Sequence, residues 1–266
     1  MRYFFHIGYN GFNYHGWQRQ PNDLSIQEIF ENCLSKILKT DITILGCGRT
    51  DAQVHASQYF FHLDVKEKWN FDLLFRLNKM LPADIAVFDI IPVQENQHAQ
   101  FDATRRTYDY FFHTTKNPFL TQLSSFYLLN PDFKKVKKAI SFLTEYTDYR
   151  SFCKSPDQYK HTICNVSSAK IFSGKSGESF RFQISSDRFL HGMIRAIVAK
   201  LLKVGTGEIS MSEFENLLVE KKTEKNLEFA YPQGLYLSKV VYPFLDVPSR
   251  TEFSAIIKKD VEWEMI

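Results

Sequence analysis

An arginine, a threonine and an aspartate stand together in the stretch GCGRTDAQVHAS, residues 46–57, as Arg49, Thr50 and Asp51. Strand-like apolar runs lie on both sides of this glycine-punctuated stretch. An aspartate in a turn often has a purely structural role, because its side chain hydrogen-bonds the backbone two residues further on. Arg49 favours a second interpretation, since a close cation keeps a carboxylate ionised even when it is partly buried. Asp51 is therefore the first candidate for a nucleophile or a base on a rigid loop.

Arg195 is a second candidate, because it stands within an apolar helical pattern. The segment FLHGMIRAIVAKLLKVG places its apolar residues on one helical stripe, and Arg195 lies at the edge of that stripe. The arginine stem can pack on the core while the guanidinium reaches water. Alternatively, the guanidinium lies over a half-buried carboxylate. The helix alone leaves both interpretations open.

Tyr108 follows two arginines in the segment FDATRRTYDYFFH, whose pattern is typical of a β-strand. Tyr108 and Tyr110 share one face of this strand, and Asp109 lies on the other. Aromatic residues favour strands, so Tyr108 can be an ordinary strand residue. It can also stack on a nucleobase with its hydroxyl near the chemistry. Arg105 and Arg106 suit phosphate contacts, which arginine makes with a planar fork of donors.

The loop GYNGFNYHGWQRQ mixes aromatic rings, glutamine and Arg19 among three glycines. Exposed aromatic rings are typical of a binding surface, and interleaved glutamine and arginine suit RNA, whose unpaired bases are stacked and read at their edges. The rings can equally fold back onto the core. Further along the chain, the basic run from Lys134 to Lys138 adds candidate phosphate contacts.

Composition limits these interpretations. The chain has 266 residues, 44% of them hydrophobic, which is enough for one large domain or two of ordinary size. The net charge of +3 permits an anionic partner without requiring one. No cysteine pair has C-x-x-C spacing and no histidine pair has H-x-x-x-H spacing, so we expect no metal. The N-terminus lacks a signal-like apolar run and no segment approaches ~18 apolar residues, so we expect a cytoplasmic protein without membrane contact.

The first half predicts the order strand, helix, strand, strand, helix, strand, which is the split β-α-β arrangement. Ser25 and Glu28 suggest a capping box at the start of the first helix, and Pro82 ends the second. The expected elements are strand 2–9, helix 25–38, strand 42–47, strand 54–65, helix 71–81 and strand 85–93.

The second half repeats this order loosely. Its expected elements are strand 104–114, helix 133–146, strands 169–172 and 180–185, helices 189–204 and 212–220, and strand 235–241. We therefore predict an α+β fold of two halves with similar topology, joined by a polar linker near residues 94–103. The expected domains are residues 1–102, which carry the Asp51 loop, and residues 103–266, which carry Tyr108 and Arg195.

Five motifs together resemble the TruA-type tRNA pseudouridine synthases, and they span nearly the whole chain in the order of that family. They are Y-x-G-x-x-Y-x-G-W-Q (Tyr9 to Gln18), G-R-T-D-A-x-V-H-A (Gly48 to Ala56), F-x-A-T-x-R-x-Y-x-Y (Phe101 to Tyr110), F-L-x-x-M-x-R-x-I-V (Phe189 to Val198) and G-L-Y-L (Gly234 to Leu237). One such motif is a weak signal, whereas five in order are highly specific.

The resemblance implies an RNA-modifying enzyme of the pseudouridine synthase fold, in which two pseudo-symmetric halves with antiparallel sheets are joined across a central catalytic cleft. The family isomerises uridines at positions 38, 39 and 40 in the anticodon stem-loop of tRNA, without cofactor or metal, as a homodimer. By motif, Asp51 is similar to the catalytic aspartate. Arg49 and Arg195 match its flanking cations, Tyr108 the stacking tyrosine, and Leu235 the apolar residue below the base.

Two positions depart from the pattern of the family. Gln53 stands where the family usually has glycine, and a positive φ there would cost on the order of 1 kcal/mol. Ala196 replaces the usual asparagine after the helix arginine, which removes one polar side chain. Both departures suggest a diverged paralogue with an altered rate or target uridine.

Two other classes of function compete with this interpretation. A non-catalytic RNA-binding protein could keep the fold and the basic surface, although the combination of Asp51, Arg49, Tyr108 and Arg195 argues against it. A small-molecule glycosidase would need a second catalytic carboxylate, for which Asp109 and Asp187 are the candidates.

Overall fold

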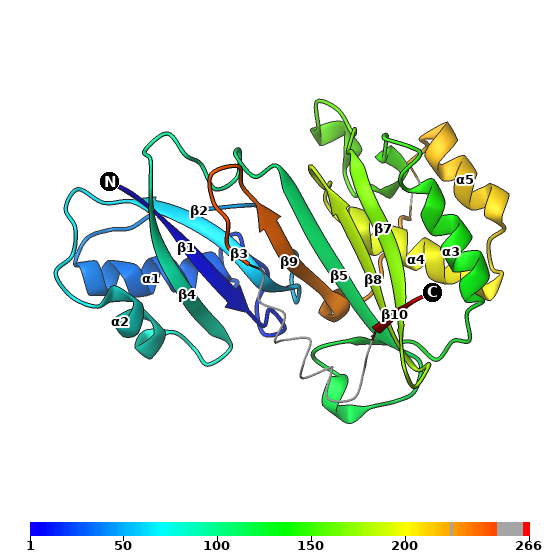
Figure 1. Ribbon diagram of the computed structural model, residues 1–266, viewed down its shortest axis with the longest axis horizontal. Coiled ribbons are helices and arrows are strands. Elements are labelled where there is room, and N and C mark those ends of the chain that lie inside the picture. Colours follow the sequence, from blue (N-terminus) through cyan, green and yellow to red (C-terminus); the bar gives the residue numbers. More distant parts are fainter. Residues whose placement is uncertain (224–225, 249–262) are drawn as a thin grey trace. The chain divides into compact units, whose positions relative to one another are not determined.

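The computed structural model describes residues 1–223, 226–248 and 263–266 (Figure 1). The chain forms two compact units. Unit 1 contains residues 1–106 and the described residues from 236 to 248, and unit 2 contains the described residues from 107 to 235 and 263 to 266. Residues 236–248, which we expected in the C-terminal half, are therefore part of unit 1.

Unit 1 has the expected order β-α-β-β-α-β, with one later strand added. Its elements are β1 (Arg2–Tyr9), α1 (Ile26–Leu38), β2 (Leu45–Gly46), β3 (His55–Asp64), α2 (Leu73–Met80), β4 (Ile85–Val93) and most of β9 (Leu235–Val241). The strands lie in the order β9-β3-β1-β4, with β2 beside β3. β3 pairs antiparallel with β1, but parallel with β9 through His55 and Tyr236.

Helix α1 forms where the sequence predicts it. The Ser25 side chain accepts a hydrogen bond from the Glu28 amide at 3.3 Å, which caps the first turn. Ile26, Phe30 and Leu34 recur at helical spacing and are fully buried. Phe30 packs against Phe61 of β3 at 4.9 Å between ring centroids. This contact fixes the helix on the sheet that leads into the Asp51 loop.

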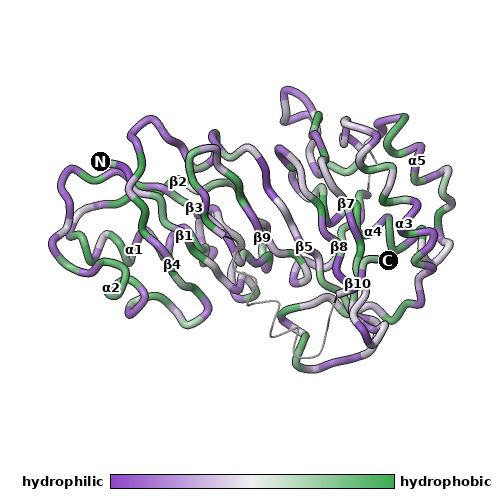
Figure 2. Tube along the Cα trace, in the orientation of Figure 1, coloured by the Kyte–Doolittle hydropathy of each residue, from purple (hydrophilic) through white to green (hydrophobic). Residues whose placement is uncertain are grey.

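In unit 2, the helices α3, α4 and α5 lie beside the strands of that unit (Figure 1). Its elements are β5 (Arg105–His113) from Thr107 onward, β6 (Ser125–Phe126), α3 (Phe133–Phe142), β7 (Val166–Gly174), β8 (Ser179–Ser186), α4 (Met193–Thr206), α5 (Met211–Glu220) and β10 (Trp263–Met265). The strand order is β10-β7-β8-β5, and β6 pairs parallel with β5. Both units contain hydrophobic stretches in their strands and helices (Figure 2).

The core of unit 2 follows from strict alternation along β8, in which Phe180, Phe182, Ile184 and Ser186 are buried. Phe180 stacks on Phe133 of α3 at 4.1 Å between ring centroids, so the helix layer and the sheet share this core. The fold is α+β, as expected, although the parallel pairs β3–β9 and β5–β6 make the sheets mixed and not purely antiparallel.

Several helix and strand boundaries differ from expectation, and two of the differences have a local cause. Helix α4 begins at Met193 and not at residue 189, because Gly192 adopts a left-handed φ of 74°. Strand β2 is confined to Leu45–Gly46, because the amides of Ile42 and Ile44 donate to Ser35 and Glu31 side chains of α1. Helix α3 ends at Phe142, four residues earlier than expected.

Candidate active site

The Asp51 loop, residues 47–54, connects β2 to β3 in unit 1. Thr50 is buried, and Asp51 is partly exposed. The Thr50 carbonyl accepts a hydrogen bond from the Trp17 amide at 3.2 Å, and the Gln53 amide donates to the Tyr14 carbonyl at 3.0 Å. The Val54 amide closes the turn on the Asp51 carbonyl at 3.2 Å. The backbone that presents the aspartate is therefore fixed on both sides, as a rigid loop requires.

The aromatic loop that follows β1 supplies this support. Tyr14 and Trp17 retain only 4% and 2% exposure, so their rings fold back onto the core, which was one of the two open interpretations. Trp17 stacks on Tyr59 at 4.1 Å between ring centroids. The Tyr59 hydroxyl donates to the Gly48 carbonyl at 2.6 Å. These rings position the Asp51 loop and are not available as stacking platforms.

Glycines permit the two loops to approach this closely. A Cβ on Gly16, which has φ of 86°, would lie 2.3 Å from the Thr50 carbonyl oxygen. A Cβ on Gly11 would lie 1.9 Å from the Val54 carbonyl oxygen. Both distances are too short for any side chain, so the glycines of the Y-x-G-x-x-Y-x-G-W-Q motif are a packing requirement of the Asp51 loop.

Gln53 has a positive φ of 64°, so the cost expected for a side chain in this conformation applies. The left-handed region costs a side-chain-bearing residue on the order of 1 kcal/mol. The chain nevertheless keeps the turn, because the Gln53 amide is anchored on Tyr14. Ala196, the other departure, is fully buried in α4 of unit 2.

Cys47 begins the loop but is unsuited to nucleophilic catalysis. Its side chain is fully buried, and burial raises the pKa of the Cys47 thiol to about 11, against a smaller opposing effect of Arg106. The thiol is therefore protonated at neutral pH. This leaves the Asp51 carboxylate as the reactive candidate on the loop.

The arginines proposed to contact phosphate have different surroundings. Arg49 and Arg105 are exposed. Arg19 forms ion pairs with Glu31 at 3.3 Å and Glu28 at 3.6 Å while its side chain stays 54% exposed. Arg106 is partly buried and donates to backbone carbonyls, including that of Cys47 at 2.8 Å.

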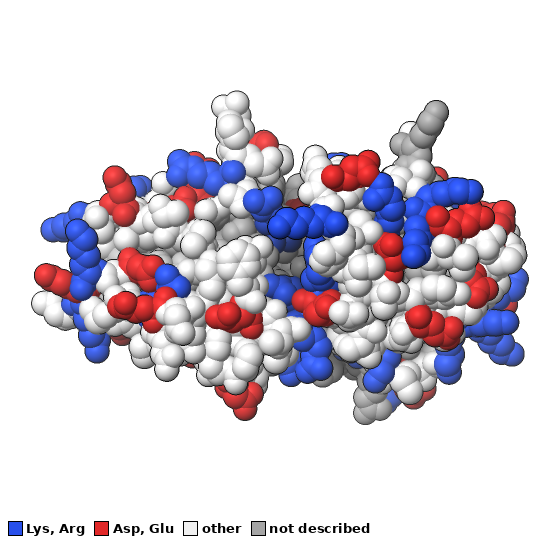
Figure 3. Space-filling view, turned by 90° about the horizontal axis from the view of Figure 1, so that it is seen from above, with Lys and Arg blue, Asp and Glu red and all other residues white. Residues whose placement is uncertain are grey.

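Basic residues occur on both units. The four lysines of the run from Lys134 to Lys138 are exposed on α3, while Val136 between them faces the core. On the face drawn in Figure 3, Lys and Arg side chains are interspersed with Asp and Glu on both units. The mixture of charges on this face agrees with the modest net charge.

Tyr108 lies on β5 in unit 2 and retains 9% exposure. Its ring packs edge-to-face on Phe189, with centroids 5.1 Å apart and an interplanar angle of 83°. Asp109 is buried and accepts a hydrogen bond from Gln183 at 2.9 Å. The Arg181 guanidinium lies 3.8 Å from the same carboxylate. Asp109 is thus engaged in the sheet of unit 2.

Arg195 holds a neighbouring segment of unit 2 through its backbone and its side chain. Its Nε donates to the Ala230 carbonyl at 2.8 Å, and the Ala230 amide donates back to the Arg195 carbonyl at 3.0 Å. The guanidinium lies over the Phe229 ring at 5.5 Å. Arg195 is partly buried, so its stem packs as a snorkelling arginine does while its head is oriented by backbone.

Leu235 begins β9 and retains 6% exposure. The preceding 3-10 turn, Pro232–Gly234, brings the backbone against β5. A Cβ on Gly234 would lie 2.4 Å from the Phe111 carbonyl oxygen and 2.6 Å from the Ser125 hydroxyl. Glycine is therefore required at this position, which sets the start of β9 and the place of Leu235.

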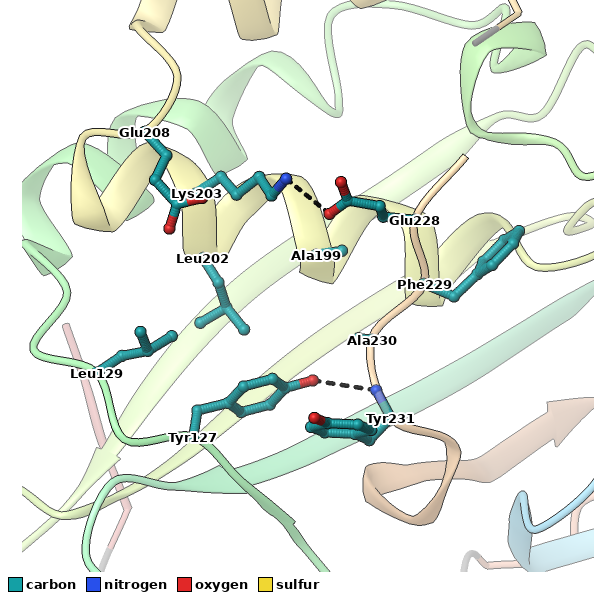
Figure 4. A pocket seen from close by; sticks show the side chains of 10 residues that line it. All are labelled: Tyr127, Leu129, Ala199, Leu202, Lys203, Glu208, Glu228, Phe229, Ala230 and Tyr231. Carbon is teal, nitrogen blue, oxygen red and sulfur yellow. Dashed lines mark hydrogen bonds and ion pairs between the residues drawn. The ribbon is translucent and has the colours of Figure 1, made fainter. Parts of the chain in front are cut away.

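A cavity of about 340 Å³, which no sequence motif indicated, lies beside the Ala230 segment (Figure 4). Tyr127 and Tyr231 stack at 5.2 Å between ring centroids along its wall, and the Tyr231 amide donates to the Tyr127 hydroxyl at 3.0 Å. Lys203 and Glu228 form an ion pair of 2.6 Å at its edge. The carboxylates on the lining disfavour a phosphate. The lining residues come from three separate chain segments, so no single sequence motif marks the cavity.

Asp187, the other candidate for a second catalytic carboxylate, caps a turn. Burial raises the pKa of its carboxyl, but hydrogen bonds from Asn165, Ser186 and the Arg188 amide outweigh burial and lower the pKa below its ordinary value. A catalytic acid needs the opposite shift. Neither Asp109 nor Asp187 resembles the second carboxylate of a glycosidase.

Within the described ranges, no group of three or more His, Cys, Asp or Glu residues could hold a metal ion. No helix in that part of the chain is long and apolar enough to cross a membrane.

Comparison with known proteins gives consistent matches. A family model described as "tRNA pseudouridine synthase" matches residues 146–243. The chain is 40% identical to tRNA pseudouridine synthase A of Parabacteroides distasonis over 245 residues, which covers 91% of this chain and 96% of that protein. It is 40% identical to the protein of the same name from Bacteroides fragilis, with coverages of 91% and 97%. The corresponding values for Porphyromonas gingivalis are 37%, 91% and 97%.

Proposed function

Because the chain belongs to the tRNA pseudouridine synthase family, we propose that it isomerises uridine to pseudouridine at positions 38, 39 and 40 in the anticodon stem-loop of tRNA. The observation that carries pseudouridine formation in tRNA is the similarity over nine-tenths of the chain to proteins named tRNA pseudouridine synthase A. The three positions rest on the resemblance of the five motifs to the TruA type. The buttressed Asp51 loop supports it, because the reaction needs a carboxylate at a fixed position. As a tRNA-modifying enzyme the protein would act in the cytoplasm.

The proposed reaction breaks the bond between N1 and C1′, turns the uracil and rejoins it through C5. The target nucleotide must leave the stack, since its reacting atoms are inaccessible in a helix. The Asp51 carboxylate then attacks C1′, as in glycoside chemistry, or removes a proton from C2′ to give a glycal. Both routes need an ionised carboxylate, and in both the uracil leaves C1′ as an anion with its charge on N1. In the first route C5 attacks C1′ and displaces the Asp51 carboxylate, whereas in the second C5 bonds to C1′ while Asp51 returns the proton to C2′. Both routes end with loss of the C5 proton and with N1 protonated in the product.

The other site residues have proposed roles on the same uridine. Tyr108 stacks on the uracil while it is detached, and its hydroxyl is suited to helping move the C5 proton. Leu235 packs against the base from its apolar side. Arg195 and Arg49 provide cations for the Asp51 carboxylate and the nearby phosphate. These roles rest on the match of Tyr108, Leu235, Arg49 and Arg195 to the motifs of the family.

Binding of tRNA is proposed to be mainly electrostatic. Arg105, Arg19 and the lysines from Lys134 to Lys138 are exposed cations suited to phosphate contact. Neutralising phosphates releases counterions, so the affinity for tRNA should fall linearly on a plot of log affinity against log salt concentration. Affinity that does not respond to salt would rule out these contacts.

We also propose a homodimer, which would give one tRNA two protein surfaces to contact. Light scattering should report about twice the 31.2 kDa chain mass at micromolar concentration. A stable monomer that forms pseudouridine would reject this part of the proposal without affecting the rest.

The test of the function is a map of pseudouridine in an unmodified tRNA transcript after incubation with the protein, by carbodiimide labelling and primer extension. Matched transcripts carry cytidine at position 38, 39 or 40, so each loses one target. We expect a pseudouridine signal at each of these positions, and we expect it to vanish in the transcript that carries cytidine there. Signals elsewhere would revise the target. No product from a folded protein that still binds tRNA would favour a non-catalytic RNA-binding paralogue.

A further inference from the structure

The Arg106 side chain occupies an unusual environment for an arginine considered as a phosphate contact. Its Nε and Nη2 donate to the Cys47 carbonyl at 3.3 and 2.8 Å. Its Nη2 also donates to the Gln100 carbonyl at 2.8 Å, and its Nη1 donates to the Ala103 carbonyl at 3.2 Å. The planar fork of the guanidinium is thus matched to three backbone oxygens within unit 1.

The carbonyls of Gln100 and Ala103 belong to a segment that is itself well anchored. The His98 amide donates to the Asp102 carboxylate at 2.7 Å, which closes a turn. The Ala99 amide donates to His62 at 3.2 Å, and the Ala99 carbonyl accepts from the Tyr242 hydroxyl at 2.6 Å. The guanidinium therefore ties Cys47 to a fixed part of unit 1.

Cys47 is the point where β2 enters the Asp51 loop. It is fully buried, and its amide donates to the Phe60 carbonyl at 2.8 Å. Gly48 lies next to the guanidinium, since a Cβ on Gly48 would be 4.0 Å from Arg106 Nε. Without Arg106 the Cys47 carbonyl would lose two hydrogen bonds in a buried position, and the peptide would have to turn to find a donor.

We propose that Arg106 is a positioning residue, which holds the Cys47 carbonyl and thereby sets the backbone that presents Asp51. The guanidinium acts through the loop and does not contact the reacting atoms. This inference rests on the proposed function for its catalytic consequence, but the effect on the loop backbone is independent of any activity.

The neighbouring arginine provides a matched comparison. Arg105 is exposed and is a candidate phosphate contact, whereas Arg106 is partly buried on carbonyls. The variants Arg106→Gln and Arg105→Gln remove the same charge one residue apart. Arg106→Lys serves as a milder variant, because lysine keeps the charge but lacks the planar fork.

The experiment measures tRNA affinity across a salt series, single-turnover pseudouridine formation at saturating tRNA, and hydrogen exchange of the peptide covering residues 47–54. We expect Arg106→Gln to lower the single-turnover rate at least tenfold and to speed exchange in that peptide, with the affinity within twofold of wild type. The rate and the exchange of Arg106→Lys should lie between those of wild type and those of Arg106→Gln. Arg105→Gln should weaken binding and reduce the salt slope by about one.

Two results would overturn the proposal. One is an Arg106→Gln protein whose affinity and salt slope fall as in Arg105→Gln while its saturated rate is retained. The other is unchanged exchange of residues 47–54. If wild type itself forms no pseudouridine, the proposed function fails, whereas the exchange measurement still decides the role of Arg106. If Arg106→Gln does not fold, Arg106→Lys gives the same comparison.

Discussion

The Tyr9 hydroxyl lies 2.9 Å from the Thr50 hydroxyl, and both groups are buried. Tyr9 ends β1, and Thr50 directly precedes Asp51. The central strands of unit 1 therefore support the Asp51 loop through side chains as well as through the backbone bonds from Trp17 and to Tyr14.

Removing either hydroxyl, that of Tyr9 or that of Thr50, should lower the stability of the protein. We expect Tyr9→Phe and Thr50→Val each to lower the free energy of unfolding by about 1 kcal/mol, the usual value of one buried hydrogen bond. In the double variant the losses should not add, with a coupling of about 0.5–1.5 kcal/mol measured by urea unfolding. Additive losses would show that the two hydroxyls do not stabilise each other.

The left-handed backbone of Gln53 predicts an order of stability among variants at this position. Gln53→Asn should be neutral or slightly stabilising, because asparagine tolerates this region well. The stability of Gln53→Gly should be close to that of wild type. Relief of about 1 kcal/mol of backbone strain is offset by the greater flexibility that glycine gives the unfolded chain. Gln53→Val should lose about 1 kcal/mol or more, because branched side chains disfavour positive φ. Thermal unfolding checks this order, and a valine variant as stable as the asparagine variant would contradict it.

His62 predicts a specific pH dependence of stability. Burial, together with Arg2 and His98, lowers the pKa of His62 to about 4, and its Nδ1 accepts a hydrogen bond from the Ala99 amide. The unfolded chain binds this proton near pH 6.5, so the free energy of unfolding should decrease as the pH falls from about 6.5 to about 4. We expect a loss of about 2 kcal/mol, allowing for partial solvent screening.

The control for this effect is His62→Asn, whose Oδ1 can accept the same hydrogen bond without titrating. Urea unfolding of both proteins at pH 7 and at pH 4.5 gives the loss of stability of each. The carboxylates titrate in both proteins, so the difference between the two losses is the contribution of His62. If the variant loses as much stability as wild type over this interval, His62 is not the source.

The sequence pattern predicted the elements that depend on local physics. The order of unit 1, the Ser25 cap and the amphipathic face of α1 follow from capping and helical spacing, and the structure confirms them. The parallel pairing of His55 with Tyr236 could not be foreseen, because it joins segments far apart in the chain. The contacts of Arg106 were likewise invisible, since its partners are backbone carbonyls that leave no mark in residue types.

Arg195 has both a proposed role toward substrate and a structural bond to Ala230, and these can be separated. Lys203 lies two turns further along α4 and holds the same segment through Glu228. We expect Arg195→Ala to lower the rate of pseudouridine formation at least tenfold at saturating tRNA, and Lys203→Ala to lower it far less. Similar losses in single-turnover assays would mean that Arg195 acts only by holding the Ala230 segment.

The central claim is that the Asp51 carboxylate carries the chemistry. Asp51→Asn is nearly isosteric but has no negative charge, and it leaves in place the backbone bonds of the loop, the Tyr9–Thr50 contact and the Tyr59–Gly48 bond. The variant should therefore fold and bind tRNA like wild type. Arg49 and Arg195 should not compensate, because a cation cannot replace the carboxylate.

The direct measurement is carbodiimide labelling of an unmodified tRNA transcript after prolonged incubation with Asp51→Asn, beside wild type at the same concentration. Folding is checked by circular dichroism and binding by filter retention. We expect full labelling at the target positions with wild type and none above background with the variant. A variant that folds, binds and still produces a substantial fraction of the wild-type pseudouridine would make Asp51 a turn residue and contradict the account.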